Sequence, residues 1–134
     1  MFDFLERRKK LFVFTPLIIY WIILFIATTL PVQSVPAIAI SDKINHLLAY
    51  FLLSVLLYLT LIFQRRSIFL FNNAAFATII IASVYGALDE IHQMFIPGRF
   101  AEFLDWLADA GGAVLGVLFI SYLIKKLKYL PSFS

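Results

Sequence analysis

The sequence contains no cysteine, which excludes disulfide bonds and metal sites built on thiolates. It is also poor in charge, because Asp, Glu, Lys and Arg make up only 14% of its 134 residues. Soluble domains carry about a quarter of such residues, which cover their surface. A chain of this composition cannot form that polar surface, so a soluble globular domain is excluded.

Strand-like alternation is missing as well, which argues against a transmembrane β-barrel, whose strands alternate over about ten residues. Long apolar runs are present instead, and 63% of the chain is hydrophobic. A helix needs about 20 residues to cross a bilayer. The sequence therefore predicts an all-α integral membrane bundle of about four transmembrane helices in one domain over 1–134. The helices are expected at about 11–30, 42–63, 68–96 and 103–124.

The stretch between the first two apolar runs bears on processing and on helix capping. Ala37-Ile38-Ala39 resembles the cleavage site of a signal peptide. The run before it, Leu11–Leu30, exceeds the apolar core of a signal peptide, which has about 7–15 residues, so we expect a permanent first helix. Ser41 or Asp42 is suited to cap the second helix, because a side-chain oxygen can accept a free backbone N–H there.

Lysine and arginine gather in three short clusters beside the apolar runs. Nine of the 11 basic residues belong to them: Arg7, Arg8, Lys9, Lys10, Arg65, Arg66, Lys125, Lys126 and Lys128. Four spans place all three clusters on one side, whereas three or five spans would divide them. The positive-inside rule then predicts a multi-pass membrane protein with both termini cytoplasmic. Clusters in this position face the lipid bilayer, so no nucleic-acid partner is expected.

The opposite ends of the helices carry polar stripes at helical spacing, since residues three or four apart share a face. The stripes are Asp42, His46 and Tyr50; Tyr85, Asp89 and His92 with Gln93 beside them; and Asp105 with Asp109. We expect them to converge, with Arg99 in the intervening loop, on one pocket at the outer leaflet. Glu90 points about 100° away from Asp89, toward either a neighbouring helix or the membrane interface. Glu102 falls in a solvated first turn, so both are placed at the margin.

Two glycines continue the face of the last stripe. Gly112 and Gly116 have the small-residue spacing that lets another helix approach closely. That helix belongs either to the same chain or to a second copy, so a homo-oligomer is one outcome.

Ionisable residues near membrane depth are costly and are therefore candidate functional sites. The expected ligand-binding residues are Asp42, His46, Tyr50, Tyr85, Asp89, His92, Gln93, Arg99, Asp105 and Asp109. Asp89, His92 and His46 are candidate acids or bases, although no catalytic role is assigned. A divalent metal has candidate ligands in His46, His92, Asp89 and Asp105. The guanidinium of Arg99 is suited to a phosphate.

Three segments resemble the signatures of the VanZ-like family, over about residues 10–125. They are Asp42–Tyr50 (DKINHLLAY), Asp89–Arg99 (DEIHQMFIPGR) and the stretch from Asp105 and Asp109 through Gly112 and Gly116. The family commonly has Asn where this chain has Asp109, so the chain gains a carboxylate. The resemblance implies a small multi-pass protein of the bacterial cell membrane. The protein after which the family is named is linked to teicoplanin resistance. The resemblance implies no particular biochemical activity.

Three functions stay open at this point. The pocket binds a lipid-linked envelope precursor, a peptidoglycan-related ligand or a glycopeptide without chemistry. Alternatively, it is the site of a membrane-embedded enzyme, with or without a metal, that acts on a lipid-linked phosphate. In the third reading the polar residues form an internal network of a structural or accessory membrane protein.

Overall fold

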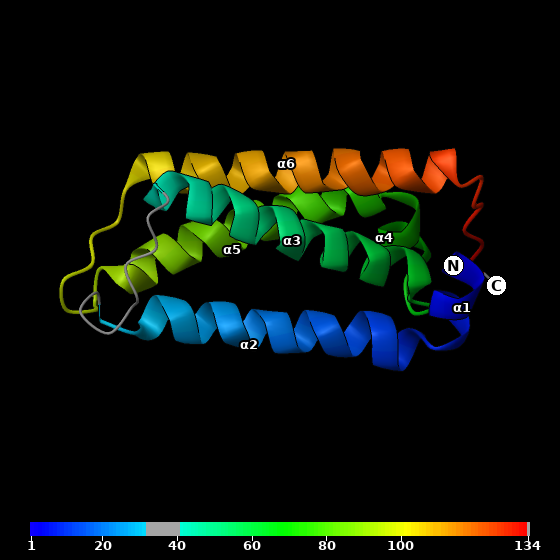
Figure 1. Ribbon diagram of the computed structural model, residues 1–134, viewed down its shortest axis with the longest axis horizontal. Helices are drawn as coiled ribbons and strands as arrows, with labels where there is room; N and C mark the ends of the chain where they lie inside the picture. Colours follow the sequence, from blue (N-terminus) through cyan, green and yellow to red (C-terminus); the bar gives the residue numbers. More distant parts are fainter. Residues whose placement is uncertain (32–40, 134) are drawn as a thin grey trace.

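The computed structural model describes residues 1–31 and 41–133 of the chain, and this part contains helices and no strand. The elements (Figure 1) are α1 Phe2–Arg7, a π-helix Lys10–Phe14, α2 Thr15–Thr29, α3 Asp42–Phe63, α4 Ile68–Asn72, α5 Ala74–Gln93 and α6 Phe103–Lys126. Four segments are long and apolar enough to cross a membrane: Lys10–Thr29, Asp42–Phe63, Ala74–Gln93 and Phe103–Lys126. The expected all-α membrane fold with four spans is confirmed. The cleavage motif considered at Ala37-Ile38-Ala39 lies outside the described residues.

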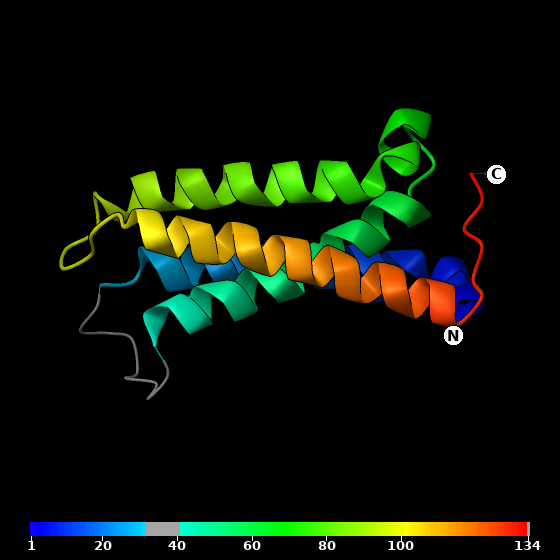
Figure 2. The same ribbon diagram turned by 90° about the horizontal axis from the view of Figure 1, so that it is seen from above.

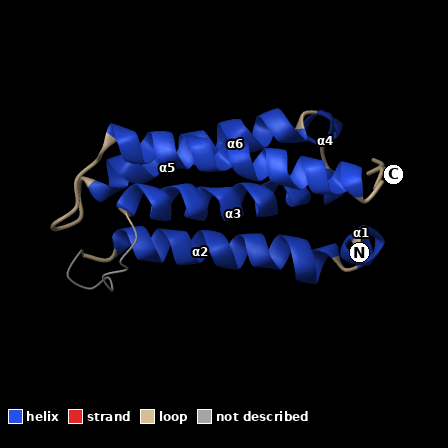
Figure 3. Cartoon of the chain, turned by 45° about the horizontal axis from the view of Figure 1, so that its top comes forward, coloured by secondary structure: helices blue, strands red, loops and turns tan. Residues whose placement is uncertain are grey.

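The long helices run side by side along the long axis of the molecule. Figure 1 and Figure 3 show α3, α5 and α6 as one group, with α2 along one side of it. Both termini lie at one end with α1 and α4, and the loop from α5 to α6 lies at the other (Figure 2). We call the first the basic end, because it carries the three clusters of Lys and Arg. The second is the acidic end, which carries Asp42, Asp89, Glu90, Glu102, Asp105 and Asp109.

The first span differs from the regular helix expected over 11–30. It begins as a π-helix over Lys10–Phe14 and continues as α2. Pro16 accounts for the change, because it has no N–H to donate and its ring clashes with the carbonyl four residues earlier in an α-helix. The wider π turn relieves that conflict. Thr15 Oγ1 then donates to the Lys10 carbonyl oxygen over 2.7 Å.

The third span is interrupted where one continuous helix was expected from 68. The chain forms α4, leaves the helix at Asn73 and begins α5 at Ala74. Asn73 has a φ of −110°, and its side-chain amide donates to the Phe69 carbonyl oxygen over 2.9 Å. Such local bonds compete with the helical pattern, which is why Asn favours helix ends. The expected single helix was therefore wrong at this point.

α5 also ends three residues earlier than the sequence predicted, at Gln93 instead of 96. Pro97 disfavours a helical backbone at Ile96, and Gly98, with φ of 79°, turns the chain toward α6. The second and fourth helices agree with expectation. α3 covers 42–63, and α6 covers 103–126 against the predicted 103–124.

Gly112 and Gly116 bring α6 into close contact with α3. A β-carbon on Gly112 would collide with the Leu47 carbonyl oxygen, and one on Gly116 with that of Phe51. Only glycine leaves room for backbones this close. The glycine face is therefore used within the chain, which settles one of the two alternatives that its spacing allowed.

α2 is less covered by the rest of the molecule than the other spans. Only 17% of its membrane window is buried, against 39% for each of the other three, so most of its apolar surface is left uncovered by the rest of the described chain. Two aromatic residues join it to the bundle. Tyr20 Oη donates to the Ala49 carbonyl oxygen over 2.9 Å, and the Trp21 ring meets the Tyr85 ring edge-on. α2 is thus attached at a few defined points.

Glu6 joins three parts of the chain at the basic end. Its carboxylate accepts from the Arg65 guanidinium and, over 2.8 Å, from the Tyr129 hydroxyl. α1, the turn after α3 and the segment after α6 are thereby held together. Burial, and next the hydrogen bond to Glu6, raise the pKa of Tyr129 above its usual value.

Candidate functional site

His46 and Asp109 form the centre of the polar cluster at the acidic end. Nδ1 of His46, one turn into α3, lies 2.9 Å from Oδ1 of Asp109 on α6. Asp109 is completely buried, while the side chain of His46 keeps 12% of its surface exposed. The close approach of α6 at Gly112, one turn farther along, is what brings this pair together.

Glu90 lies in the same cluster, although helical spacing had placed it at the margin. It is buried, and its Oε1 is 4.0 Å from Nδ1 of His46. Its Oε2 accepts the backbone N–H of Glu102 over 2.8 Å. Helical spacing gives only the direction of Glu90 relative to Asp89 on the same helix. In the structure α6 lies on the side to which Glu90 points. Two adjacent carboxylates in the sequence were the available indication that Glu90 belongs to the site. Only the position of α6 shows that Glu90 joins the polar cluster while Asp89 lines a different space.

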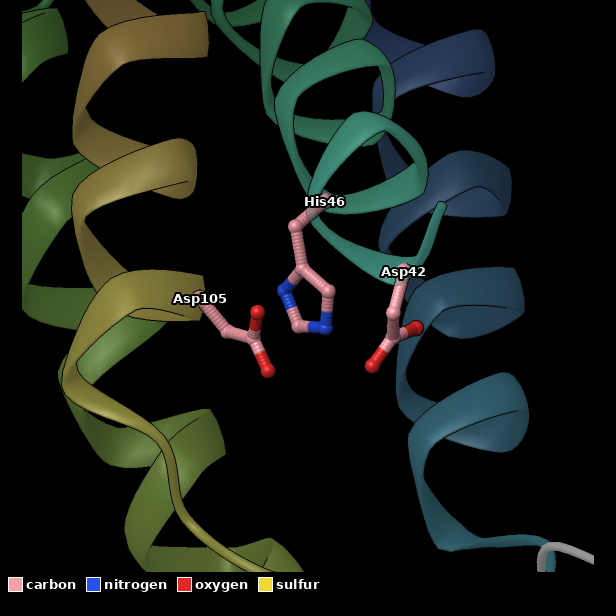
Figure 4. Close-up of side chains that lie close together, drawn as sticks. All are labelled: Asp42, His46 and Asp105. Atoms are coloured by element: carbon pink, nitrogen blue, oxygen red, sulfur yellow. The ribbon is translucent and has the colours of Figure 1, made fainter. Parts of the chain in front are cut away.

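A lysine and two further carboxylates lie at the edge of the cluster. Nζ of Lys43 is 2.9 Å from Glu102 and 3.2 Å from Oδ1 of Asp105. Asp105 is buried, whereas Glu102 is exposed as expected. Asp42 is also exposed, and Figure 4 shows the ring of His46 between the carboxylates of Asp42 and Asp105. Ser41 takes the N-cap position of α3, but its side chain makes no capping hydrogen bond.

A cavity of about 250 Å³ opens between α2, α3 and α5 at the acidic end. Its lining residues are Leu24, Ala27, Thr28, Asp42, Asn45, His46, Ala49, Tyr50, Asp89 and Arg99. Five of them belong to the ligand-binding set expected from the sequence. The three residues of α2 do not, because the part of α2 near this end offers only Thr28 and Thr29 as polar side chains. One wall of the cavity is thus mostly apolar, and the others are polar.

Arg99 connects the loop after α5 to the end of α2. Its Nε and one terminal nitrogen donate to the carbonyl oxygens of Leu30 and Ala27 over 2.9 and 2.8 Å. The other donates to Oε1 of Gln93 over 3.2 Å, and Gln93 in turn donates to Asp89 over 3.2 Å. The guanidinium, which suits carbonyls at a helix C-terminus, closes the cavity on this side. Its use for a phosphate stays a prediction.

His92 and Tyr85 lie on the same helix face as Asp89, but they contact α2 and do not line the cavity. Nε2 of His92 is 3.1 Å from Oγ1 of Thr29, and its ring stacks on Phe25. Tyr85 lies between the rings of Trp21 and Tyr50. The structure therefore separates the two histidines, which the sequence had grouped together.

Two groups of three side chains in the described part of the chain have donor atoms within 4.8 Å of one another: Asp42, His46 and Asp105, and His46, Glu90 and Asp109. Of the metal ligands considered from the sequence, His46 and Asp105 belong to the first group. Asp89 and His92 belong to neither. A metal in either group would therefore depend on His46 and on one carboxylate from α6, together with one from α3 or α5.

Carboxylates outnumber cationic groups around the cavity, which sets what it can bind. Lys43 and Arg99 are already bonded to protein oxygens. Asp42, Asp89 and the imidazole of His46 face the space as acceptors or as proton-accepting groups. The Tyr50 hydroxyl is buried and has no hydrogen-bond partner among the described residues. The arrangement is suited to a ligand that brings hydrogen-bond donors or positive charge.

Comparison with known proteins shows a family that the sequence matches. The family model described as VanZ/LLP1 matches residues 3–125. An uncharacterized protein of Schizosaccharomyces pombe is 32% identical over 116 residues, which cover 86% of this chain. The chain spans 64% of the length of that curated relative. No solved structure matches the chain significantly.

Proposed function

Because the chain belongs to the VanZ/LLP1 family of membrane proteins, we propose that it binds the headgroup of an envelope lipid or lipid-linked precursor in the cavity between α2, α3 and α5. The cavity itself carries this proposal. Its volume of about 250 Å³ accommodates a headgroup, and its wall from α2 is largely apolar. Pockets with apolar walls and a few convergent polar groups are typical of ligand sites.

The polar wall favours headgroups that carry hydroxyl or ammonium groups, as lipid-linked sugars and peptides do. Asp42, Asp89 and His46 present acceptors. Attached acyl chains would lie along the lipid-facing side of α2, where Ile18, Ile22 and Phe25 are more than half exposed. The proposal thus assigns the headgroup and the chains of one amphiphile to two adjoining surfaces.

The distribution of Lys and Arg supports a location of this cavity at the outer leaflet of the membrane. If the basic end is cytoplasmic, as the positive-inside rule favours, the cavity faces the outer leaflet of a bacterial cell membrane. There it would meet peptidoglycan precursors or a glycopeptide, and binding would change susceptibility to teicoplanin. The ratio of inhibitory concentrations between cells expressing the wild type and an inactive variant measures this part of the proposal.

Native mass spectrometry of the purified protein tests the binding itself. We expect a lipid adduct on the wild type and about a tenfold lower occupancy for Asp89→Asn, which keeps the shape but removes the charge that faces the ligand. Glu102→Gln is the matched control, because Glu102 is exposed and does not line the cavity. Equal lipid retention by all three proteins would contradict the proposal. A loss of thermal stability in Asp89→Asn without loss of lipid would favour the structural reading.

One observation favours catalysis as a second candidate function. His46 lines the cavity while its other side is bonded to Asp109, and a histidine oriented by a carboxylate is suited to act as a general base. The substrate would be a lipid-linked phosphate, and the reaction its hydrolysis by water. Because carboxylates surround the cavity, a bound divalent cation would have to offset the charge of the phosphate. Incubation of the protein with such a lipid, followed by mass spectrometry of the products, separates turnover from binding. His46→Gln should then remove the product and spare the fold.

A further inference from the structure

We propose that His46, Glu90 and Asp109 bind one divalent metal ion of the zinc class through Nδ1 of the histidine and one oxygen of each carboxylate. The three side chains come from three different helices, α3, α5 and α6, and their donor atoms lie within 4.8 Å of one another. The site adjoins the ligand cavity and shares His46 with it. It does not depend on the proposed lipid ligand.

The first observation in its favour is an unpaired buried oxygen. Only 6% of the surface of Glu90 is exposed, and its Oε1 has no hydrogen-bond partner among the described residues. That oxygen lies 4.0 Å from Nδ1 of His46. A buried carboxylate oxygen without a donor costs free energy unless something cationic satisfies it.

The second observation is the balance of charge in this group. When both are ionised, Glu90 and Asp109 place two negative charges in a buried space, and Lys43 is 2.9–3.2 Å from other carboxylates. A protonated His46 compensates one of the two. A dication compensates both and leaves the imidazole neutral, which is the form that binds metals.

The spacing of the donor atoms agrees with a coordination sphere. Ligands arranged tetrahedrally at about 2.0–2.2 Å from a zinc ion lie about 3.3–3.6 Å from each other. In the structure Nδ1 of His46 is 2.9 Å from Oδ1 of Asp109 and 4.0 Å from Oε1 of Glu90. Displacements of a few tenths of an ångström bring both pairs into that range. One imidazole with two carboxylates suits zinc and its neighbours, and three protein ligands leave a position open.

The ligands are also held in place by their surroundings. Oε2 of Glu90 accepts the backbone N–H of Glu102, which orients the carboxylate. Asp109 fits against α5 at Gly86, where an added β-carbon would come within 2.8 Å of its Oδ2. Such support fixes side chains before a metal binds.

The neighbouring group of Asp42, His46 and Asp105 is less suited. Oδ1 of Asp105 is 3.2 Å from the ammonium of Lys43, so a cation already compensates this carboxylate. Asp42 is exposed and therefore loses less by staying hydrated. The geometry assigns the metal to the inner group.

Equilibrium dialysis of the detergent-purified chain against ZnCl₂, followed by elemental analysis, tests the proposal. The protein must carry no polyhistidine tag, because a tag would bind zinc itself. We expect about one zinc per chain, and at least tenfold weaker binding by Glu90→Gln, which keeps the shape of the side chain. Glu102→Gln and Asp42→Asn should bind as the wild type does.

Several results would overturn it. They are the absence of stoichiometric zinc on the wild type, equal binding by Glu90→Gln, or a loss in Asp42→Asn with binding kept in Glu90→Gln. Circular dichroism checks that each variant folds. If Glu90→Gln does not fold, the Co²⁺ spectrum of the wild type decides. Intense visible bands indicate a low-coordinate protein site and support the proposal, whereas the weak spectrum of hydrated cobalt contradicts it.

Discussion

Asp109 on α6 and His46 on α3 lie 63 residues apart in the chain, and a hydrogen bond of 2.9 Å joins them. The bond forms where Gly112 brings the two helices into backbone contact. Close helix packing and the polar cluster are thus two consequences of one arrangement. The pair also occupies the boundary between the buried cluster and the cavity, since His46 takes part in both.

Removal of the Asp109 carboxylate should destabilise the bundle. Asp109→Ala leaves Nδ1 of His46 without its buried partner, which costs about 1–3 kcal/mol, whereas Asp109→Asn keeps an oxygen acceptor and should cost less. The thermal unfolding midpoint in detergent, measured with a chelator so that no metal contributes, should fall in the order wild type, Asn, Ala. An alanine variant as stable as the wild type would show that the bond does not stabilise the fold.

The adjacent glycines of α6 should respond in opposite ways to the same substitution. Gly112→Ala places a β-carbon on the Leu47 carbonyl oxygen and should cost about 1–3 kcal/mol through overpacking. Gly111→Ala meets nothing within 4 Å and should be neutral or stabilising by up to about 1 kcal/mol, because alanine favours helix. Chemical or thermal unfolding of both variants measures the contrast. Similar losses at the two positions would rule out the close α3–α6 contact.

Arg99→Lys should loosen the end of α2 although the charge is kept. Lysine cannot reproduce the planar fork that reaches Ala27, Leu30 and Gln93 together. We expect faster amide hydrogen exchange over the last two turns of α2 and little change in α6. Arg66→Lys is the control, because Arg66 is exposed at the other end of the molecule. Unchanged exchange in α2 would show that Arg99 is not its main attachment.

Stability at high pH should depend on Tyr129. Burial and the bond to Glu6 raise the pKa of Tyr129 in the folded protein above its usual value near 10. The proton is then held more tightly in the folded state. The stabilisation is therefore complete below about pH 10 and is lost as the pH rises toward the raised folded value.

Tyr129→Phe tests this by removing the titrating group. The variant should show a shallower loss of stability with pH above about 10 than the wild type does. Absorbance at the phenolate wavelength, followed through the same titration, should lose a late-titrating component. Tyr122→Phe is a suitable control, because Tyr122 is largely exposed on α6 and makes no bond to Glu6. Identical pH profiles for wild type and Tyr129→Phe would contradict the prediction.

The absence of cysteine makes the orientation directly testable. Asp3 belongs to α1 at the basic end, and Phe100 belongs to the loop between α5 and α6 at the acidic end, so Asp3→Cys and Phe100→Cys place a single cysteine at each end. With the basic end in the cytoplasm, a membrane-impermeant maleimide added to intact cells should label only the cysteine at 100. Permeabilisation should then allow labelling at position 3. The reverse pattern would place the acidic end inside and move the cavity to the cytoplasmic leaflet.

The sequence predicted the second and fourth helices well because each is a long apolar run bounded by clear polar signals. It predicted the first and third less well. Pro16 and Asn73 both disturb the regular backbone hydrogen bonds of an α-helix. Whether the chain answers with a π turn, as before Pro16, or with a break, as at Asn73, depends on the conformation of the neighbouring turns. A hydrophobicity pattern does not contain that information.

The sequence by itself determined the membrane fold, the gathering of basic residues beside three helix ends and the polar stripes at the others, because these follow from composition and helical period. Only the tertiary structure decided which faces meet. It placed Glu90 beside His46, directed His92 toward α2 and gave the cavity its wall from α2. Helical spacing fixes directions within one helix, whereas contacts between helices depend on how closely their backbones pack, and here Gly112 and Gly116 set that distance.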